Sequence, residues 1–189
     1  MAEIKETKEE SVFPFIEGEK INLNSINLEH IGLYTKLMNS PKGRKYARFN
    51  VPQTIEEVKK LFEPTKQEVK DKIFFEIWQK KDKKAVGLIG FNRIQWFSRI
   101  GMITCMVEQE FWGKGIGTEA IKLVVDYGFK EMNLHKISAR IFSPDKASIR
   151  IAEKLGFTHE ITLKKEIFVD GVHVDIVNYI IFKADWMKT

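Results

Sequence analysis

Three glycines stand at alternate positions in one short stretch, between an apolar segment ending at Val107 and a helical pattern starting near Thr118. They are Gly113, Gly115 and Gly117. Glycine carries no Cβ, so the backbone bends tightly there and approaches a ligand closely. The first amides of a helix are unpaired and carry partial positive charge, so a helix beginning here would bind an anion such as a pyrophosphate. The sequence therefore predicts a phosphate site in this loop. A plain strand-to-helix turn is the alternative interpretation.

The spacing of these glycines excludes two common phosphate-binding loops. A Walker A loop needs Gly-Lys-Ser/Thr after four spacer residues, and here Lys114 is followed by another glycine. The dinucleotide fingerprint Gly-x-Gly-x-x-Gly has a different spacing and needs an acidic residue after the next strand. Lys114 adds one positive charge to the predicted anion site.

Hydrophobic periodicity places the glycine loop within an α/β chain. Strands are predicted at Lys20–Ile26, Ile73–Gln79, Val86–Ile94, Ile100–Val107, Lys136–Phe142, Glu166–Val169 and Val172–Phe182. Helices are predicted from the cap Asn27 to a break at Ser40–Gly43, from the capping box Thr54–Glu57 towards Pro64, at Thr118–Met132, and at Lys146–Leu155 with its end at Gly156.

The order of these elements predicts the topology of the sheet. Short connections among the middle strands indicate an antiparallel meander. The step from Ile100–Val107 through a helix to Lys136–Phe142 predicts a parallel pair with a right-handed crossover. Asp170-Gly171 between two apolar runs predicts a tight hairpin. The expected fold is a mixed, mostly antiparallel sheet flanked by helices.

The composition of the 189 residues, 43% hydrophobic and 30% charged, indicates a globular protein. We expect one domain over residues 18–189 after a flexible or extended lead-in at 1–17. No apolar run is long enough to span a bilayer, so no membrane partner is expected. The only cysteine, Cys105, excludes an intrachain disulfide and fits the cytoplasm. The net charge of +5 is scattered, which makes nucleic acid an unfavoured partner. The four histidines lack metal-ligand spacing, and no metal is predicted.

The segment Trp112-Gly-Lys-Gly-Ile-Gly-Thr118 resembles the pyrophosphate signature Arg/Gln-x-x-Gly-x-Gly/Ala of the GCN5-related N-acetyltransferase (GNAT) superfamily, with Trp112 in the Arg/Gln position. A second segment, Asp145–Phe157, resembles the Asn-x-x-Ser…Glu-Lys-x-Gly-Phe run of one branch. That branch is similar to the ribosomal-protein-alanine N-terminal acetyltransferases and the polyamine acetyltransferases. The likeness covers about Gly18 to the C-terminus, and two motifs in register are more specific than either alone.

The resemblance implies that acetyl-coenzyme A binds between two splayed parallel strands, with its pantetheine arm along the first strand like an added strand. A bulge beside the splay would free an amide to polarise the thioester carbonyl. The implied coenzyme-binding residues are Cys105, Met106, Val107, Trp112, Gly113, Lys114, Gly115, Ile116, Gly117, Thr118, Asp145 and Ser148.

The acid–base residues depart from the family pattern. Many members place a tyrosine as general acid at the position of Ala152. Ser148, one helical turn earlier, is the candidate general acid, and binding of the coenzyme is its alternative role. Asp145 replaces the usual asparagine, and a helix N-cap is its alternative role. No general base is identified, because Glu76, Glu108 and Glu110 fit structural or surface roles.

Cys105 invites an acetyl-cysteine mechanism, but no neighbour in the sequence would lower its pKa, so packing is the favoured interpretation.

We therefore expect transfer of an acetyl group from acetyl-coenzyme A to a primary amine, with a protein N-terminal α-amine favoured over a polyamine. The acceptor site is expected at the N-terminal helices, residues 42–53 and the final hairpin. A non-catalytic acyl-coenzyme A-binding module is the alternative from another class, and a homodimer is an open alternative to a monomer.

Overall fold

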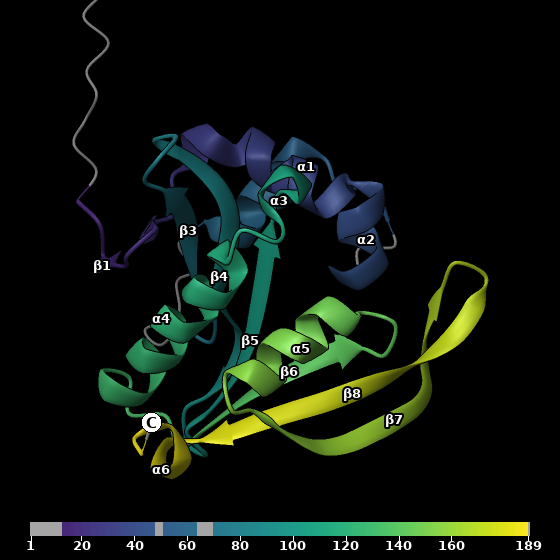
Figure 1. Cartoon of the computed structure of the whole chain (residues 1–189). Coiled ribbons are helices and arrows are strands. Elements are labelled where there is room, and N and C mark those ends of the chain that lie inside the picture. The colour runs from purple at the N-terminus through teal and green to yellow at the C-terminus, as the bar shows by residue number, and fades with distance from the viewer. Residues whose placement is uncertain (1–12, 48–50, 64–69, 189) are drawn as a thin grey trace, which may run out of the picture.

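The computed structural model describes residues 13–47, 51–63 and 70–188 (Figure 1). Within these ranges one sheet has the strand order β1-β2-β3-β4-β5-β6-β8-β7. The strands are β1 (Ile16–Glu17), β2 (Ile21–Ser25), β3 (Ile73–Gln79), β4 (Lys84–Gln95), β5 (Ile100–Val107), β6 (Lys136–Phe142), β7 (Thr158–Val169) and β8 (Val172–Phe182). The helices are α1 (Ile31–Asn39), α2 (Pro41–Ala47), α3 (Ile55–Phe62), α4 (Ile116–Lys130), α5 (Lys146–Lys154) and α6 (Lys183–Trp186), with 3-10 turns η1 (Leu28–His30) and η2 (Gln109–Phe111).

The predicted fold class is confirmed. Strands β1 to β5 pair antiparallel in chain order, β5 and β6 pair parallel, and β8 pairs antiparallel with both β6 and β7. The predicted bounds of β3, β5, β6 and β8 agree with the structure. Asp170 and Gly171 form the predicted hairpin turn, with φ of 50° and 83°. Both central residues of that turn have positive φ, which Asp-Gly accommodates.

Strands β5 and β6 pair over only three residues. The partners are Ile100 with Lys136, Gly101 with Ile137, and Met102 with Ser138. Beyond these pairs the two strands separate, as Figure 1 shows for the gap between β5 and the β6–β8 half of the sheet. This is the splay that the family resemblance implies.

Two apolar clusters hold the helices on the sheet. The larger one buries Val124, Val125 and Phe129 of α4 against β4, β5 and β6. Gly101 and Gly128 allow this close approach, because a Cβ on either would lie within 3 Å of the Phe91 ring. The smaller cluster joins α1 and α3 to Leu88 of β4 through Tyr34, Leu37, Met38 and Val58. The three N-terminal helices gather at the upper end of the molecule in Figure 1.

The predicted break at Ser40–Gly43 is wrong in part, because α2 begins at Pro41 directly after α1. Ser40 Oγ accepts a hydrogen bond of 2.9 Å from the Gly43 amide, and proline suits the first helical position. A Cβ on Gly43 would lie 2.1 Å from the Leu37 carbonyl oxygen, so the glycine permits a close contact between the two helices. The caps at Asn27 and Thr54 are confirmed, although a 3-10 turn precedes α1.

Two element starts and one short helix also differ from the prediction. Helix α4 begins at Ile116 rather than Thr118, because Gly115 at φ 82° is its N-cap. Strand β7 begins at Thr158 rather than Glu166. Two register shifts against β8 interrupt the alternation that would reveal the first part of β7. Helix α6 is too short for a periodic pattern. Its Trp186 is buried and donates from Nε1 to Asp126 Oδ1 of α4 at 2.8 Å.

Candidate active site

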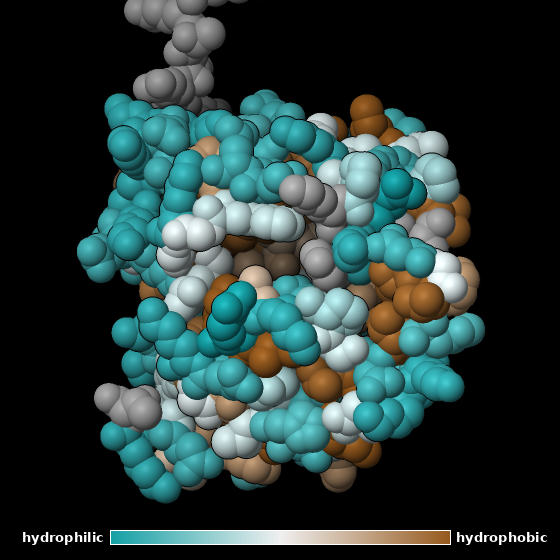
Figure 2. All heavy atoms as spheres, turned by 45° about the vertical axis from the view of Figure 1, so that its right-hand side comes forward, coloured by the Kyte–Doolittle hydropathy of each residue, from teal (hydrophilic) through white to brown (hydrophobic). Residues whose placement is uncertain are grey.

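The opening between β5 and β6 continues into a cavity of about 1060 Å³. The second half of β5, the glycine loop, the start of α5, β6, and the junction of α1 with α2 all line it. The face in Figure 2 is hollowed near its centre, with hydrophobic side chains at the bottom of the hollow. Cavities of this size accommodate a cofactor-sized ligand.

The glycine loop has the backbone geometry of an anion site. Gly113 and Gly115 have φ of 73° and 82°, where side chains other than glycine are strained. Gly115 caps α4 without a side-chain hydrogen bond, so the first amides of this 15-residue helix keep their donors. A Cβ added at Gly117 would meet only the Val107 side chain, at 4.0 Å. The space in front of the helix start is open.

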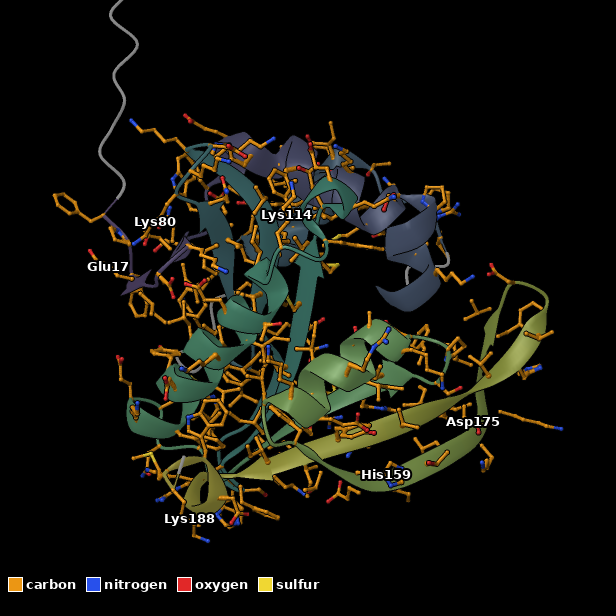
Figure 3. All side chains as sticks on the ribbon, viewed as in Figure 1. Glu17, Lys80, Lys114, His159, Asp175 and Lys188 are labelled. Atoms are coloured by element: carbon orange, nitrogen blue, oxygen red, sulfur yellow. The ribbon has the colours of Figure 1, made fainter. Side chains whose placement is uncertain are left out.

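Most, but not all, of the predicted coenzyme residues line this cavity. Those that line it are Cys105, Met106, Val107, Trp112, Gly113, Gly117, Asp145 and Ser148. Lys114, Gly115, Ile116 and Thr118 are not among the lining residues. Ile116 is buried in the core. Lys114 Nζ lies 4.9 Å from the centre of the Phe111 ring, next to the loop (Figure 3).

Trp112 occupies the position at which the family signature has Arg or Gln. Its indole Nε1 donates a hydrogen bond of 2.7 Å to the carbonyl oxygen of Val107 at the end of β5. The side chain thus fixes the loop against the strand that leads into it.

Lysines around the loop supply positive charge that sequence reasoning missed. Lys20 Nζ would lie 3.5 Å from a Cβ built on Gly115. Lys84 Nζ lies 4.7 Å from the centre of the Phe111 ring. The same ammonium group forms an ion pair with Glu110 Oε1 at 3.7 Å. Lys20 directly precedes β2 and Lys84 begins β4, so only the folded sheet brings them to the loop. The sequence carries no local signal for either.

Cys105 lies on β5 in the wall of the cavity. Burial raises the pKa of its thiol to about 12. The thiol is therefore protonated at neutral pH, and the protonated form is a poor nucleophile. The structure favours packing over an acetyl-cysteine intermediate.

Ser148 and Asp145 form a local pair at the start of α5. Asp145 Oδ1 accepts from the Ser148 amide at 3.1 Å, which is the N-cap bond. Ser148 Oγ donates to Asp145 Oδ2 at 2.7 Å. The sequence thus identifies correctly that Asp145 caps the helix, and both side chains also line the cavity.

Each carboxylate considered as a base has a partner in the structure. Glu108 pairs with Lys36 of α1, and this contact raises the pKa of the Lys36 ammonium. Glu76 is buried away from the cavity, where it accepts from Tyr34 Oη at 2.6 Å and contacts His30 Nδ1 at 2.7 Å. Burial, with help from Glu76, raises the pKa of Tyr34 well above its usual range. These contacts fit the structural roles expected for both glutamates.

The elements expected to form the acceptor site do meet. Lys45 Nζ of α2 lies 2.7 Å from Asp170 Oδ2 at the tip of the β7–β8 hairpin. Lys36, Leu37 and Ser40 of the α1–α2 junction line the cavity. The predicted segment 42–53 includes residues 48–50, which lie outside the described ranges.

The bulge expected beside the splay occurs on β4. The register shifts between Phe91 and Arg93, opposite Ile103 and Met102. Strand β5 itself keeps its regular run. Its edge towards β6 has no strand partner after Met102, so backbone groups of residues 103–107 face the cavity along that edge.

Within residues 13–47, 51–63 and 70–188, no three His, Cys, Asp or Glu side chains lie close enough together to hold a metal ion. No helix in the same ranges is long and apolar enough to cross a membrane.

Comparisons with known proteins agree with this geometry. Residues 20–158 match the model of the acetyltransferase (GNAT) domain. The chain is 27% identical to the uncharacterized N-acetyltransferase YoaA of Bacillus subtilis over 91% of this chain and 98% of that protein. It is 31% identical to the spermidine N(1)-acetyltransferase of Escherichia coli K12, over 56% of this chain. The chain spans 57% of that relative and 56% of the probable N-acetyltransferase YjcK of B. subtilis, so it covers little more than half of either.

Solved structures show the same fold. The spermidine N-acetyltransferase of Vibrio cholerae, in complex with CoA and spermine, superimposes with a TM-score of 0.82 at 22% identity, over 90% of this chain and 99% of that chain. A GNAT-family acetyltransferase from Bacillus anthracis gives a TM-score of 0.75 at 24% identity, over 89% and 98% of the two chains. The family match, the splayed β5–β6 pair and the glycine loop at the start of α4 together confirm the predicted family: the chain belongs to the GNAT acetyltransferases.

Proposed function

We propose that this protein transfers the acetyl group of acetyl-coenzyme A to a primary amine by direct attack in a ternary complex. One observation carries the proposal. The cavity joins a glycine-capped helix start to an unpaired strand edge, as a ligand with a pyrophosphate and an amide-containing arm requires. We assign the activity to a single domain at residues 18–189. The lone cysteine supports a cytoplasmic location.

The residues of the chain fit this ligand in two regions. The open amides at the start of α4, with Lys20 and Lys114 nearby, suit the pyrophosphate. The free edge of β5 at Cys105–Val107 suits hydrogen bonding to the pantetheine amides. The other predicted coenzyme residues remain part of the proposed site. Those outside the cavity lining belong to the glycine loop and the first turn of α4.

Catalysis in this proposal depends mainly on positioning. Holding the amine against the thioester removes much of the entropic barrier. Backbone amides on the free edge of β5 are the donors available to an oxyanion, a contribution worth about 3–4 kcal/mol in other enzymes. Ser148 is the proposed acid for the departing thiolate, and its hydroxyl must then turn away from Asp145. Water removes the proton of the amine.

The charge of the cavity lining bears on the acceptor. The charged residues in the lining are Lys36, Glu108, Glu110, Arg140, Asp145 and Lys146, three of each sign. A polycation favours an acidic groove, so a balanced lining supports an acceptor with one cationic amine, such as a protein N-terminal α-amine. The polyamine alternative is supported by relatives that carry spermidine acetyltransferase names.

The test is a thiol-release assay with acetyl-coenzyme A and two acceptor sets, peptides with free N-termini and polyamines. Turnover with peptides and not with spermidine supports the α-amine. The reverse result supports the polyamine alternative. Coenzyme binding by calorimetry without turnover on any amine would instead identify a non-catalytic acyl-coenzyme A-binding module. Size-exclusion chromatography with light scattering would decide between a monomer and a homodimer.

A further inference from the structure

A second, smaller cavity of about 250 Å³ lies against the paired end of β5 and β6. Side chains from β4, β5, β6, β7 and β8 line it, and no helix contributes to its wall. The glycine loop, Ser148 and Asp145 have no part in it. Its residues are outside both motifs that identify the family.

The two cavities lie back to back across the sheet. Met102 and Ser138 line the small cavity, and the residues that follow them, Ile103 and Ala139, line the large one. Successive residues of a strand point to opposite faces of a sheet. Met102 and Ser138 also form the last pair before the strands separate. The sheet therefore opens directly beside the small cavity.

Arg140 lies between the two cavities. It is the first residue of β6 beyond the separation that points towards the small cavity, and it lines both cavities. The small cavity therefore lies beside the opening, on the opposite face of the sheet from the proposed coenzyme site.

The charged residues that line the small cavity are both arginines. Arg140 Nη2 lies 3.4 Å from Glu166 Oε1 of β7, so a carboxylate already offsets part of its charge. Arg93 of β4 has no ion pair or side-chain hydrogen bond with any residue that the structure describes. Gln95, Ser138 and Asn178 add polar groups.

The rest of the wall is apolar. Ile100, Met102, Ile161 and Leu163 complete it. Five polar or charged and four apolar residues thus line the cavity, a mixed lining that suits a polar small molecule with an apolar part. Guanidinium groups bind carboxylates in a planar, two-pronged geometry, which lysine does not reproduce.

We propose that this cavity binds the acceptor, and that the acceptor carries a carboxylate close to its reacting amine, held by Arg93 with support from Arg140. The proposal rests on the acetyl-transfer function above and names its substrate class. Two sources share this chemistry: a peptide with an acidic residue next to its N-terminus, and a free acidic amino acid. A polyamine would place its cationic groups beside two guanidiniums, which like-charge repulsion opposes.

The experiment compares kcat/KM for matched acceptors at saturating acetyl-coenzyme A. One pair is a hexapeptide with Glu or Gln at its second position, the other is free glutamate or glutamine, and spermidine is added as a cationic acceptor. Wild type should prefer the acidic member of at least one pair by about tenfold, because hydrogen bonds to charged groups discriminate on that scale. Which pair shows the preference identifies the source.

Arg93→Gln should abolish this preference, and Arg93→Glu should shift it towards spermidine. Arg150→Gln is the matched control, because Arg150 is an exposed arginine of α5 that lines neither cavity. Equal rates for acidic and neutral acceptors in wild type would overturn the proposal. So would an acidic preference that survives in Arg93→Gln.

A binding measurement separates this inference from the proposed function. Calorimetry with the Glu hexapeptide and with glutamate, in the presence of coenzyme A, needs no turnover. Binding that Arg93→Gln weakens by about tenfold, in a protein that acetylates no amine, would support the site and overturn the catalytic function. Turnover on amines with no preference for acidic acceptors would support the catalytic function and overturn the proposed acceptor site.

Discussion

The two sides of the β5–β6 opening are built from different kinds of group. The donor side consists of backbone features: a strand edge, two glycines with positive φ and a helix start, all within residues 105–118. The proposed acceptor side consists of side chains from distant elements, such as Arg93 of β4 and Arg140 of β6 in the small cavity. A site built from backbone groups can be predicted from a short segment of the sequence. A side-chain site exists only once the sheet has formed.

The largest effect is expected at Cys105, in the wall of the donor side. The pKa of its thiol, raised from 9.0 to about 12, lowers the thiolate fraction at pH 8 about a thousandfold. Iodoacetamide should therefore modify Cys105 about a thousandfold more slowly than an exposed thiol. Because the group loses its proton only near pH 12, the rate should keep rising above pH 10 instead of levelling near pH 9.

The control places a cysteine at Lys122, exposed on α4, in a Cys105→Ala background. Modification of Cys105 at the rate of that control would show a solvated thiol and would reopen the acetyl-cysteine mechanism.

Gly117→Asp should weaken coenzyme binding by at least about a hundredfold, because a carboxylate within about 4 Å of a phosphate costs several kcal/mol near a protein surface. The Cβ itself fits, since its nearest neighbour is Val107 Cγ2 at 4.0 Å. Calorimetric titration with coenzyme A measures the loss. Gly32→Asp is the matched control, because a Cβ at this helical glycine meets nothing within 4 Å.

Unchanged coenzyme affinity in Gly117→Asp would overturn the assignment of the pyrophosphate site to this loop. The donor side would then be an ordinary strand-to-helix turn, and the contrast with the acceptor side would disappear.

Ser148→Ala should lower kcat by about tenfold and leave coenzyme affinity unchanged, since a positioned proton donor acts on the chemical step. Steady-state kinetics with direct coenzyme titration separates the two quantities. A loss of coenzyme affinity equal to the loss in kcat would assign the hydroxyl to binding. The Ser148 hydroxyl would then keep its hydrogen bond to Asp145 throughout the reaction.

Tyr34→Phe tests how α1 is held beside the large cavity. The Tyr34 hydroxyl donates to buried Glu76, and its loss leaves that carboxylate short of a partner. The free energy of unfolding should fall by about 1–3 kcal/mol in urea denaturation. Because α1 also carries Lys36 and Leu37 to the cavity, KM for the amine should rise a few-fold more than Kd for the coenzyme.

Tyr127→Phe is the comparison variant for this measurement. Tyr127 packs on Phe75, and it has no side-chain hydrogen bond with a described residue. A stability loss as large as that of Tyr34→Phe would show that the Glu76 contact contributes little.

The sequence predicted the elements that form the proposed donor side because the information for them is local. The glycine spacing, the Asp145 cap and four strand boundaries follow from propensities within a few residues. The start of α4 was displaced by two residues because a glycine caps it instead of a side chain. Family membership followed from two short motifs in register.

The parts that escaped prediction depend on tertiary contacts. Pro41 and Gly43 conceal helix α2, because both residues are typical of turns. Gly43 is needed here for its close contact with the Leu37 carbonyl oxygen and not for a turn. The register shifts of β7 conceal its first half. Lys20, Arg93 and Arg140 are ordinary surface cations in the sequence, and only the folded sheet brings Lys20 to the glycine loop and the two arginines to the small cavity.

The three-residue pairing of β5 with β6 leaves two unpaired strand edges inside the sheet. Free edges are templates for pairing with other chains and so for aggregation. Here they converge at Met102 and Ser138, with α4 on one side and α5 on the other, as Figure 1 shows. On the face that carries α4 and α5, a flat strand from another molecule meets these helices before it reaches the edges. The helices that shape the site also protect the protein from the hazard that the site creates.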